Sequence, residues 1–179
     1  MSPGSDAGPG DARFPVIPAE VSLTDTNTVG WVEPRWRWRG RRLLLCLARE
    51  DVMTDAGGRK IALPMAGCDL SILNSGRAPL LLNHYMQTDN VAGVIERGWI
   101  EDGRLYAEAR LARVPSLAEV RRLVWGRVIR NCSMGYLMRR DSHAGEGDIY
   151  AIRWWRPYEV SLCGVPRGWL DALPCQPWP

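Results

Sequence analysis

The chain has 179 residues, a formal net charge of +3 and 46% hydrophobic residues, which is enough for one domain with a buried core. So small a charge does not indicate a nucleic-acid partner, and no apolar run approaches the length of a membrane span. The five cysteines are odd in number and lack CxxC spacing, so we expect free thiols in a soluble protein of a reducing compartment.

Both ends of the sequence differ in composition from the middle. Residues 1–20 are rich in Gly, Pro, Asp and Ala, which predicts a flexible N-terminal arm. The folded domain is expected over residues 21–169. The segment 170–179 contains three prolines and is expected to lie along the surface as a C-terminal tail.

Residues 21–47 favour β-strands. Between residues 35 and 39 arginine alternates with tryptophan, so Trp36 and Trp38 share one face of a strand. Such a strand could bind single-stranded nucleic acid by stacking. The low net charge favours the simpler interpretation, a buried aromatic face opposite a solvated arginine face. The apolar run 43–47 predicts a strand buried on both faces.

A strand and a hairpin follow in the middle of the chain. The segment 79–86 predicts a strand whose apolar run ends at His84. The hairpin is expected over 91–100 and 105–111, with its turn at Glu101-Asp102-Gly103. Period-two alternation predicts that four residues face inward: Leu105, Ala107, Ala109 and Leu111. The residues between them, Tyr106, Glu108 and Arg110, are expected to face outward.

The only convincing helix is expected over residues 115–125. Pro115 suits its first turn, and Gly126 could adopt the left-handed conformation that ends a helix. Leu117, Val120 and Val124 fall on one face. After Gly126 the period becomes two, so Ser133 and Gly135 share one strand face while Met134 and Tyr136 share the other.

The last third of the chain predicts a loop at 141–147 and a strand at 149–155. Pro157 is expected to interrupt the chain, and a final strand carries Glu159 and ends near Cys163. Many short strands with few helices predict a β-rich α+β fold, with an antiparallel barrel or sandwich as its architecture.

Three residues could form an acyl-transfer site, because a nucleophile, a base and a carboxylate each lie on a strand segment: Ser133, His84 and Glu159. Taken singly, each is more simply a structural residue. The other histidine, His143, lies in a polar loop that suits fixed geometry poorly. Cys132 is a rival nucleophile, but it points to the face opposite Ser133 and is expected in the core.

Metal ions and other cofactors are not expected. Two distant histidines and unpaired cysteines have no ligand spacing typical of a metal site.

Several short motifs occur together in one order: Leu-Leu-Asn-His at 81–84, Gly-Val at 93–94, the helix, Ser-Met-Gly-Tyr at 133–136 and Glu-Val-Ser-Leu at 159–162. Over about residues 42–167 the chain resembles the prohead (capsid maturation) proteases of tailed phages with the HK97-type capsid. That family is similar to the herpesvirus maturation protease, which implies an antiparallel β-barrel with a few surrounding helices.

The resemblance implies that Ser133 is the nucleophile, His84 the general base and Glu159 the carboxylate that orients the histidine. By analogy with the herpesvirus strand, Arg167 could help to form the oxyanion site. This chain has arginine there, where alanine is common in the phage proteases.

The function that the resemblance implies is that of a serine endopeptidase. It would cleave the scaffolding segment of the major capsid protein, and itself, inside assembling proheads in the host bacterial cytoplasm. No membrane or specific nucleic acid is expected as a partner, and self-association is left open. Two alternatives remain: a catalytically inactive capsid-assembly protein of the same fold, and a nucleic-acid-binding β module.

Overall fold

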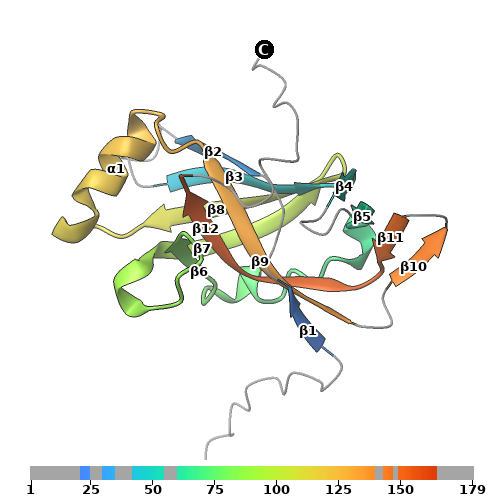
Figure 1. The fold of residues 1–179 in the computed structure, drawn as a ribbon. Helices are drawn as coiled ribbons and strands as arrows, with labels where there is room; N and C mark the ends of the chain where they lie inside the picture. The colour runs from blue at the N-terminus through green and yellow to red at the C-terminus, as the bar shows by residue number, and fades with distance from the viewer. Residues whose placement is uncertain are drawn as a thin grey trace, which may run out of the picture.

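The computed structural model describes residues 21–24, 30–34, 42–54, 60–139, 143–146 and 149–164. In these residues the fold is β-rich with one α-helix, as predicted (Figure 1). The expected arm at 1–20, the arginine–tryptophan segment at 35–39 and the tail at 170–179 lie outside the described residues, and so does Arg167.

Twelve strands are described: β1 Val21–Thr24, β2 Gly30–Pro34, β3 Arg42–Arg49, β4 Val52–Thr54, β5 Lys60–Ala62, β6 Pro79–Leu82, β7 Val91–Glu101, β8 Arg104–Leu111, β9 Asn131–Arg139, β10 His143–Glu146, β11 Ile149–Ile152 and β12 Trp155–Cys163. The helix is α1, Ala118–Trp125, and the short 3-10 turns are η2 Met65–Gly67, η3 Leu73–Ser75, η4 Thr88–Asn90 and η5 Pro115–Leu117. None of the described helices is long and apolar enough to cross a membrane.

The strands form one large, curled sheet and one small sheet. The large sheet has the order β1-β9-β12-β6-β7-β8-β3-β2, and β2 also pairs with β9, so the sheet curls until its ends meet. The small sheet, β10-β11-β5-β4, lies at the end of the molecule opposite α1 (Figure 1). The β-rich class is therefore confirmed, whereas a specifically herpesvirus-like arrangement stays a prediction.

Two pairings depart from the expected antiparallel barrel: β11 runs parallel to β5 in the small sheet, and the second lies in the large sheet. β12 runs parallel to β6, with Val160 beside Leu80 and Leu162 beside Leu82. A parallel pair needs a long crossover connection, and here the chain between β6 and β12 passes through the hairpin, α1 and β9. The prediction of a wholly antiparallel sheet was thus wrong, and the parallel β6–β12 pair lies where the site residues gather.

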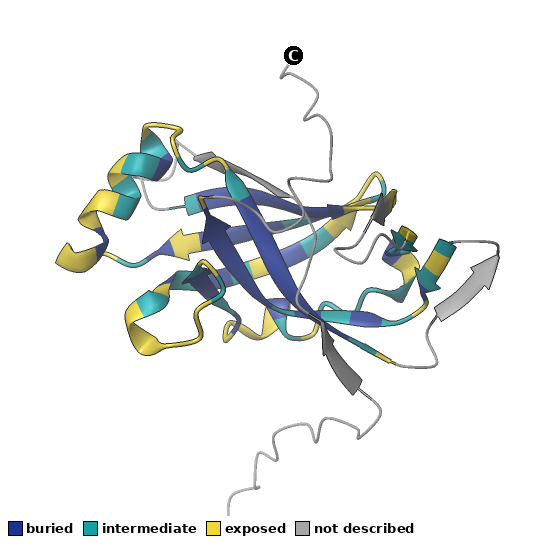
Figure 2. Ribbon diagram, in the orientation of Figure 1, coloured by how far each residue is buried: buried dark blue, intermediate teal, exposed yellow. Residues whose placement is uncertain are grey.

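The core lies inside the curled sheet. β3 is buried on both faces, as its continuous apolar run predicts, and the four residues expected to face inward from β8 are fully buried. Most residues of β3, β9 and β12 are buried (Figure 2). Glu108 was expected to face solvent, yet it is only 8% exposed. It is held by Arg97, whose Nε donates a hydrogen bond of 3.0 Å to Oε2.

The helix lies within the predicted bounds, but its end differs in detail. Gly126 has a φ of −73°, so it does not take the left-handed conformation expected of it. That role falls to Arg127, with a φ of 56°. The N–H of Val128 donates to the carbonyl of Leu123, and the N–H of Arg127 to that of Val124, which is a Schellman motif one residue later than predicted.

Two further predictions near the C-terminal end were wrong. Residues 143–146, expected in a loop, form β10 and pair with β11. Pro157 does not interrupt the strand, because β12 continues through it. The pairing with β9 shifts in register there: Pro157 pairs with Tyr136, and Glu159 with Gly135. Proline is tolerated there because a β-bulge leaves a position without a ladder hydrogen bond.

Gly93, on β7, provides a test of how tightly the hairpin strands approach each other. A Cβ at this position would overlap the backbone carbonyl of Arg110 on β8. Gly93→Ala should therefore lower the free energy of unfolding by about 1–3 kcal/mol, measured by urea denaturation. Gly164→Ala is the control, because its Cβ would meet nothing within 4 Å. Equal effects of the two substitutions would contradict this packing.

Candidate active site

His84 lies in a tight turn directly after β6. Asn83 and His84 both have positive φ, 52° and 62°, and the N–H of Tyr85 donates to the carbonyl of Leu82 at 3.1 Å. Two consecutive left-handed residues define a type I′ turn, which costs on the order of 1 kcal/mol per non-glycine residue. The N–H of Asn83 continues the pairing with β12 by donating to Leu162, so the turn holds His84 against that strand.

His84 and Glu159 form a close, partly enclosed pair. Nδ1 of the imidazole lies 2.8 Å from Oε1 of Glu159, and Glu159 is only 2% exposed. This rules out the simpler expectation of a strand glutamate that faces solvent. Because the carboxylate accepts, the proton is assigned to Nδ1, and a neutral His84 then carries its lone pair on Nε2.

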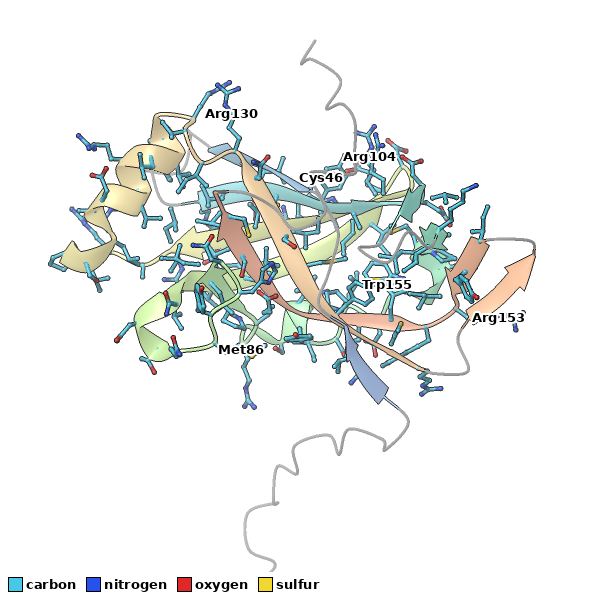
Figure 3. The ribbon with its side chains drawn as sticks, in the orientation of Figure 1. Cys46, Met86, Arg104, Arg130, Arg153 and Trp155 are labelled. Carbon is cyan, nitrogen blue, oxygen red and sulfur yellow. The ribbon has the colours of Figure 1, made fainter. Side chains whose placement is uncertain are left out.

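A bulge in β12 explains why Glu159 faces His84. Before the bulge Trp155 faces the core and packs edge-on against Tyr136, with ring centroids 5.9 Å apart. After it, Val160 faces the core. Tyr158 is the extra residue. Before it the core-facing residues of β12 have odd numbers, and after it they have even numbers. The side chain of Glu159 therefore points to the face opposite the core. Figure 3 shows Trp155 on the side of the molecule opposite α1.

Ser133 and Gly135 lie on the same face as Glu159. β9 pairs with β12 so that Ser133 is beside Ser161 and Gly135 beside Glu159. A Cβ at Gly135 would lie 2.6 Å from Oε1 of Glu159 and 2.6 Å from Cζ of Tyr158. Glycine at 135 therefore makes room for the carboxylate, and Ser133 is fully buried.

The three predicted residues are brought together unequally. His84 and Glu159 are in direct contact. Ser133 lies on β9 beside Ser161 of β12, and Ser161 forms hydrogen bonds with both His84 and Glu159. Nε2 of His84 is buried and has no hydrogen-bond partner among the described residues. A Ser133–His84 hydrogen bond is therefore not formed in this structure, so the catalytic roles of the three residues stay predictions.

Two neighbours of the histidine were missed by sequence reasoning. Ser161 accepts the backbone N–H of His84 at 3.0 Å and donates to Oε2 of Glu159 at 2.9 Å. The thiol of Cys163 interacts with the imidazole. Both residues follow Glu159 at spacings of two and four on one strand. Period-two alternation could have placed them on the site face.

These contacts determine the charge state of His84. Its pKa is raised above the ordinary value by the interaction with the Cys163 thiol and by the hydrogen bond and negative charge of Glu159, while burial opposes the shift. The protonated imidazole is thus favoured. A base at this position becomes neutral only at a pH above the ordinary histidine value of about 6.5.

The remaining candidates take other places. Cys132 lies in the core as predicted, fully buried, and burial raises the pKa of its thiol well above the usual range. His143 lies on β10, and the predicted oxyanion role of Arg167 is untested because that residue is not described. Among the described residues, no group of three or more His, Cys, Asp or Glu side chains is arranged to hold a metal ion.

The fold is similar to that of a solved phage protein. The chain is similar in structure to the capsid assembly protease gp21 of bacteriophage T4, with a TM-score of 0.52 and 14% sequence identity over 82% of this chain and 99% of that one. No family model matches the sequence.

A second similarity is in sequence. A major capsid protein of Halomonas phage phiHAP-1 is 32% identical over 102 residues, which cover 54% of this chain. The chain spans only 17% of that capsid protein's length.

Gly135→Ala tests whether the absence of a side chain at 135 lets Glu159 reach His84. The added methyl group would overlap both Glu159 and Tyr158, so the carboxylate should move away and the pKa of His84 should fall towards its ordinary value. Titration of the imidazole resonances by NMR measures this, with His143→Gln to assign the two histidines. An unchanged His84 titration in Gly135→Ala would show that the glycine has no such role.

Proposed function

We propose that this chain is a serine endopeptidase of phage capsid maturation, which cleaves the scaffolding segment of the major capsid protein and also itself. The buried Glu159–His84 pair carries the proposal, because the carboxylate lies 2.8 Å from Nδ1 and so leaves Nε2 as the ring nitrogen that can accept a proton. The fold shared with a capsid assembly protease supports the activity, and the similarity to a phage major capsid protein supports the substrate.

In the proposed reaction Ser133 Oγ attacks the carbonyl carbon of the scissile peptide while Nε2 of His84 takes the hydroxyl proton. The tetrahedral oxyanion then collapses, the C–N bond breaks, and the imidazolium returns its proton to the leaving amine. Water next attacks the acyl-enzyme, with His84 accepting one proton of the water and passing it to Ser133 Oγ. The products are a carboxylic acid and the free enzyme.

Glu159 has a defined part in this sequence. Its hydrogen bond to Nδ1 fixes the tautomer in which Nε2 is the acceptor, and its charge stabilises the imidazolium formed during attack. The same charge raises the pKa of the resting His84. In this proposal the charge that stabilises the imidazolium intermediate also requires a higher working pH.

Substrate binding must also expose the nucleophile, since Ser133 is fully buried. Tyr85 and Met86 follow His84 directly and are 58% and 68% exposed. Large exposed apolar side chains beside a site are suited to contact with a partner. We assign them to contact with apolar residues of the capsid-protein segment as it enters, during assembly of the prohead.

A catalytically inactive assembly protein of the same fold is the second candidate. The burial of Ser133 and the missing contact at Nε2 favour it, although catalytic hydrogen bonds often tighten only when substrate is bound. A fluorophosphonate probe separates the two candidates. Stoichiometric labelling of Ser133 supports the enzyme, and absence of labelling together with absence of capsid-protein cleavage supports the assembly protein.

Ser133→Ala and His84→Ala should each abolish cleavage of co-expressed capsid protein, followed by gel electrophoresis. Because the two residues act as a unit, the double variant should be scarcely slower than either single variant. Cleavage at the normal rate by Ser133→Ala would refute the assignment.

Two of the buried thiols, Cys132 and Cys163, provide the controls for the nucleophile. Cys132→Ala should retain cleavage, because Cys132 faces the core. Cys163→Val removes the thiol beside His84, and turnover should persist with the pH profile moved to lower pH. Complete loss of turnover in Cys163→Val with a normal fold would instead indicate a thiol nucleophile.

The pH dependence follows from the direction of the His84 shift. Because a raised pKa keeps the base protonated to higher pH, kcat/KM should rise with pH through a limb above about 6.5. Glu159→Gln should move this limb to lower pH and reduce kcat by between about 10²- and 10⁴-fold, the range from lost orientation to a lost triad acid. A pH–rate profile of each variant measures both effects, and a wild-type profile in Glu159→Gln would make Glu159 a bystander.

A further inference from the structure

We propose that Ser161 is a positioning residue that holds His84 and Glu159 in register with each other, a role that rests on the proposed function. Its hydroxyl bonds to both residues, through the backbone N–H of His84 and Oε2 of Glu159. Ser161 is fully buried, so it acts through these two residues.

The bond to His84 continues the parallel pairing of β6 and β12 beyond its last backbone contact. The N–H of Asn83 donates to the carbonyl of Leu162 at 3.1 Å. The next donor along the chain, the N–H of His84, has turned away with a φ of 62°. It finds Ser161 Oγ at 3.0 Å. A side-chain oxygen thus satisfies the N–H that the left-handed turn removes from the ladder.

The bond to Glu159 selects which carboxylate oxygen serves the histidine. The Ser161 hydroxyl donates to Oε2 at 2.9 Å, and Oε1 faces Nδ1 at 2.8 Å. Fixing one oxygen stops rotation of the carboxylate about its terminal bond, a torsion that is otherwise broad. One hydroxyl therefore sets both the backbone position of His84 and the orientation of its partner.

Threonine and valine at 161 provide a matched comparison. Both add a methyl group at a buried position and have nearly the same shape, but only threonine keeps the hydroxyl. Relative to Ser161→Thr, Ser161→Val should lose about 10- to 10²-fold in kcat, the loss expected for a small misplacement of catalytic groups. KM should change little, because Ser161 does not touch substrate.

The second readout is the titration of His84 by NMR, with His143→Gln in each protein for assignment. In Ser161→Val the pKa of His84 should fall towards its ordinary value, whereas in Ser161→Thr it should stay raised. Ser161→Ala, which removes volume and does not add it, should behave as the valine variant if crowding is not the cause. Thermal denaturation confirms that each protein is folded.

The proposal is overturned if the threonine and valine variants share one kcat and one His84 titration, since the hydroxyl would then have a structural role at most. The NMR readout also separates this outcome from failure of the proposed function. If Ser133→Ala still cleaves, the endopeptidase assignment fails, but a hydroxyl-dependent shift of the His84 pKa would still show that Ser161 positions the pair.

Discussion

The site depends on one extra residue in the last described strand. β12 contributes Trp155 to the core and, after the bulge at Tyr158, contributes Glu159 to the opposite face. Without the extra residue the strand would direct Glu159 into an apolar interior, where an unpaired carboxylate is strongly unfavourable. The bulge thus lets Trp155 and Val160 both face the core while Glu159, between them, faces the polar site.

The buried carboxylate of Glu159 depends in turn on the residues around it. A carboxylate that is 2% exposed must be satisfied by partners, because burial of a charge without hydrogen bonds is destabilising. His84 and Ser161 each form a hydrogen bond with it, and Gly135 provides the space. His84 follows β6, Gly135 lies on β9 and Ser161 lies on β12. The carboxylate of Glu159 is therefore accommodated only when these three strands are correctly aligned.

The sequence predicted the local elements well, because their signals are local. The hairpin turn, the buried run of β3 and the helix from Pro115 all follow from turn chemistry and periodicity. Ordered motifs singled out Ser133, His84 and Glu159 as candidates, and the structure brings His84 and Glu159 into contact. Alternation could not show the bulge at Tyr158, because one extra residue exchanges the two faces of the strand without changing its composition. The parallel β6–β12 pair was missed for a related reason: pairing between distant segments leaves no mark in either one alone.

The burial of Glu108 was missed because alternation reports on side-chain direction and not on ion pairs. Arg42 and Arg97 cover this carboxylate from adjacent strands, and their positions depend on the strand order of the sheet. Similarly, the end of α1 was placed one residue early, since glycine permits a left-handed conformation without requiring it.

The long crossover between β6 and β12 affects when the site can exist. His84 and Glu159 are 75 positions apart in the chain, and contacts of such separation form late because loop closure must be completed first. During synthesis the histidine leaves the ribosome long before its carboxylate. A growing chain therefore holds the parts of the site without their geometry, and the contact between His84 and Glu159 forms only when β12 docks.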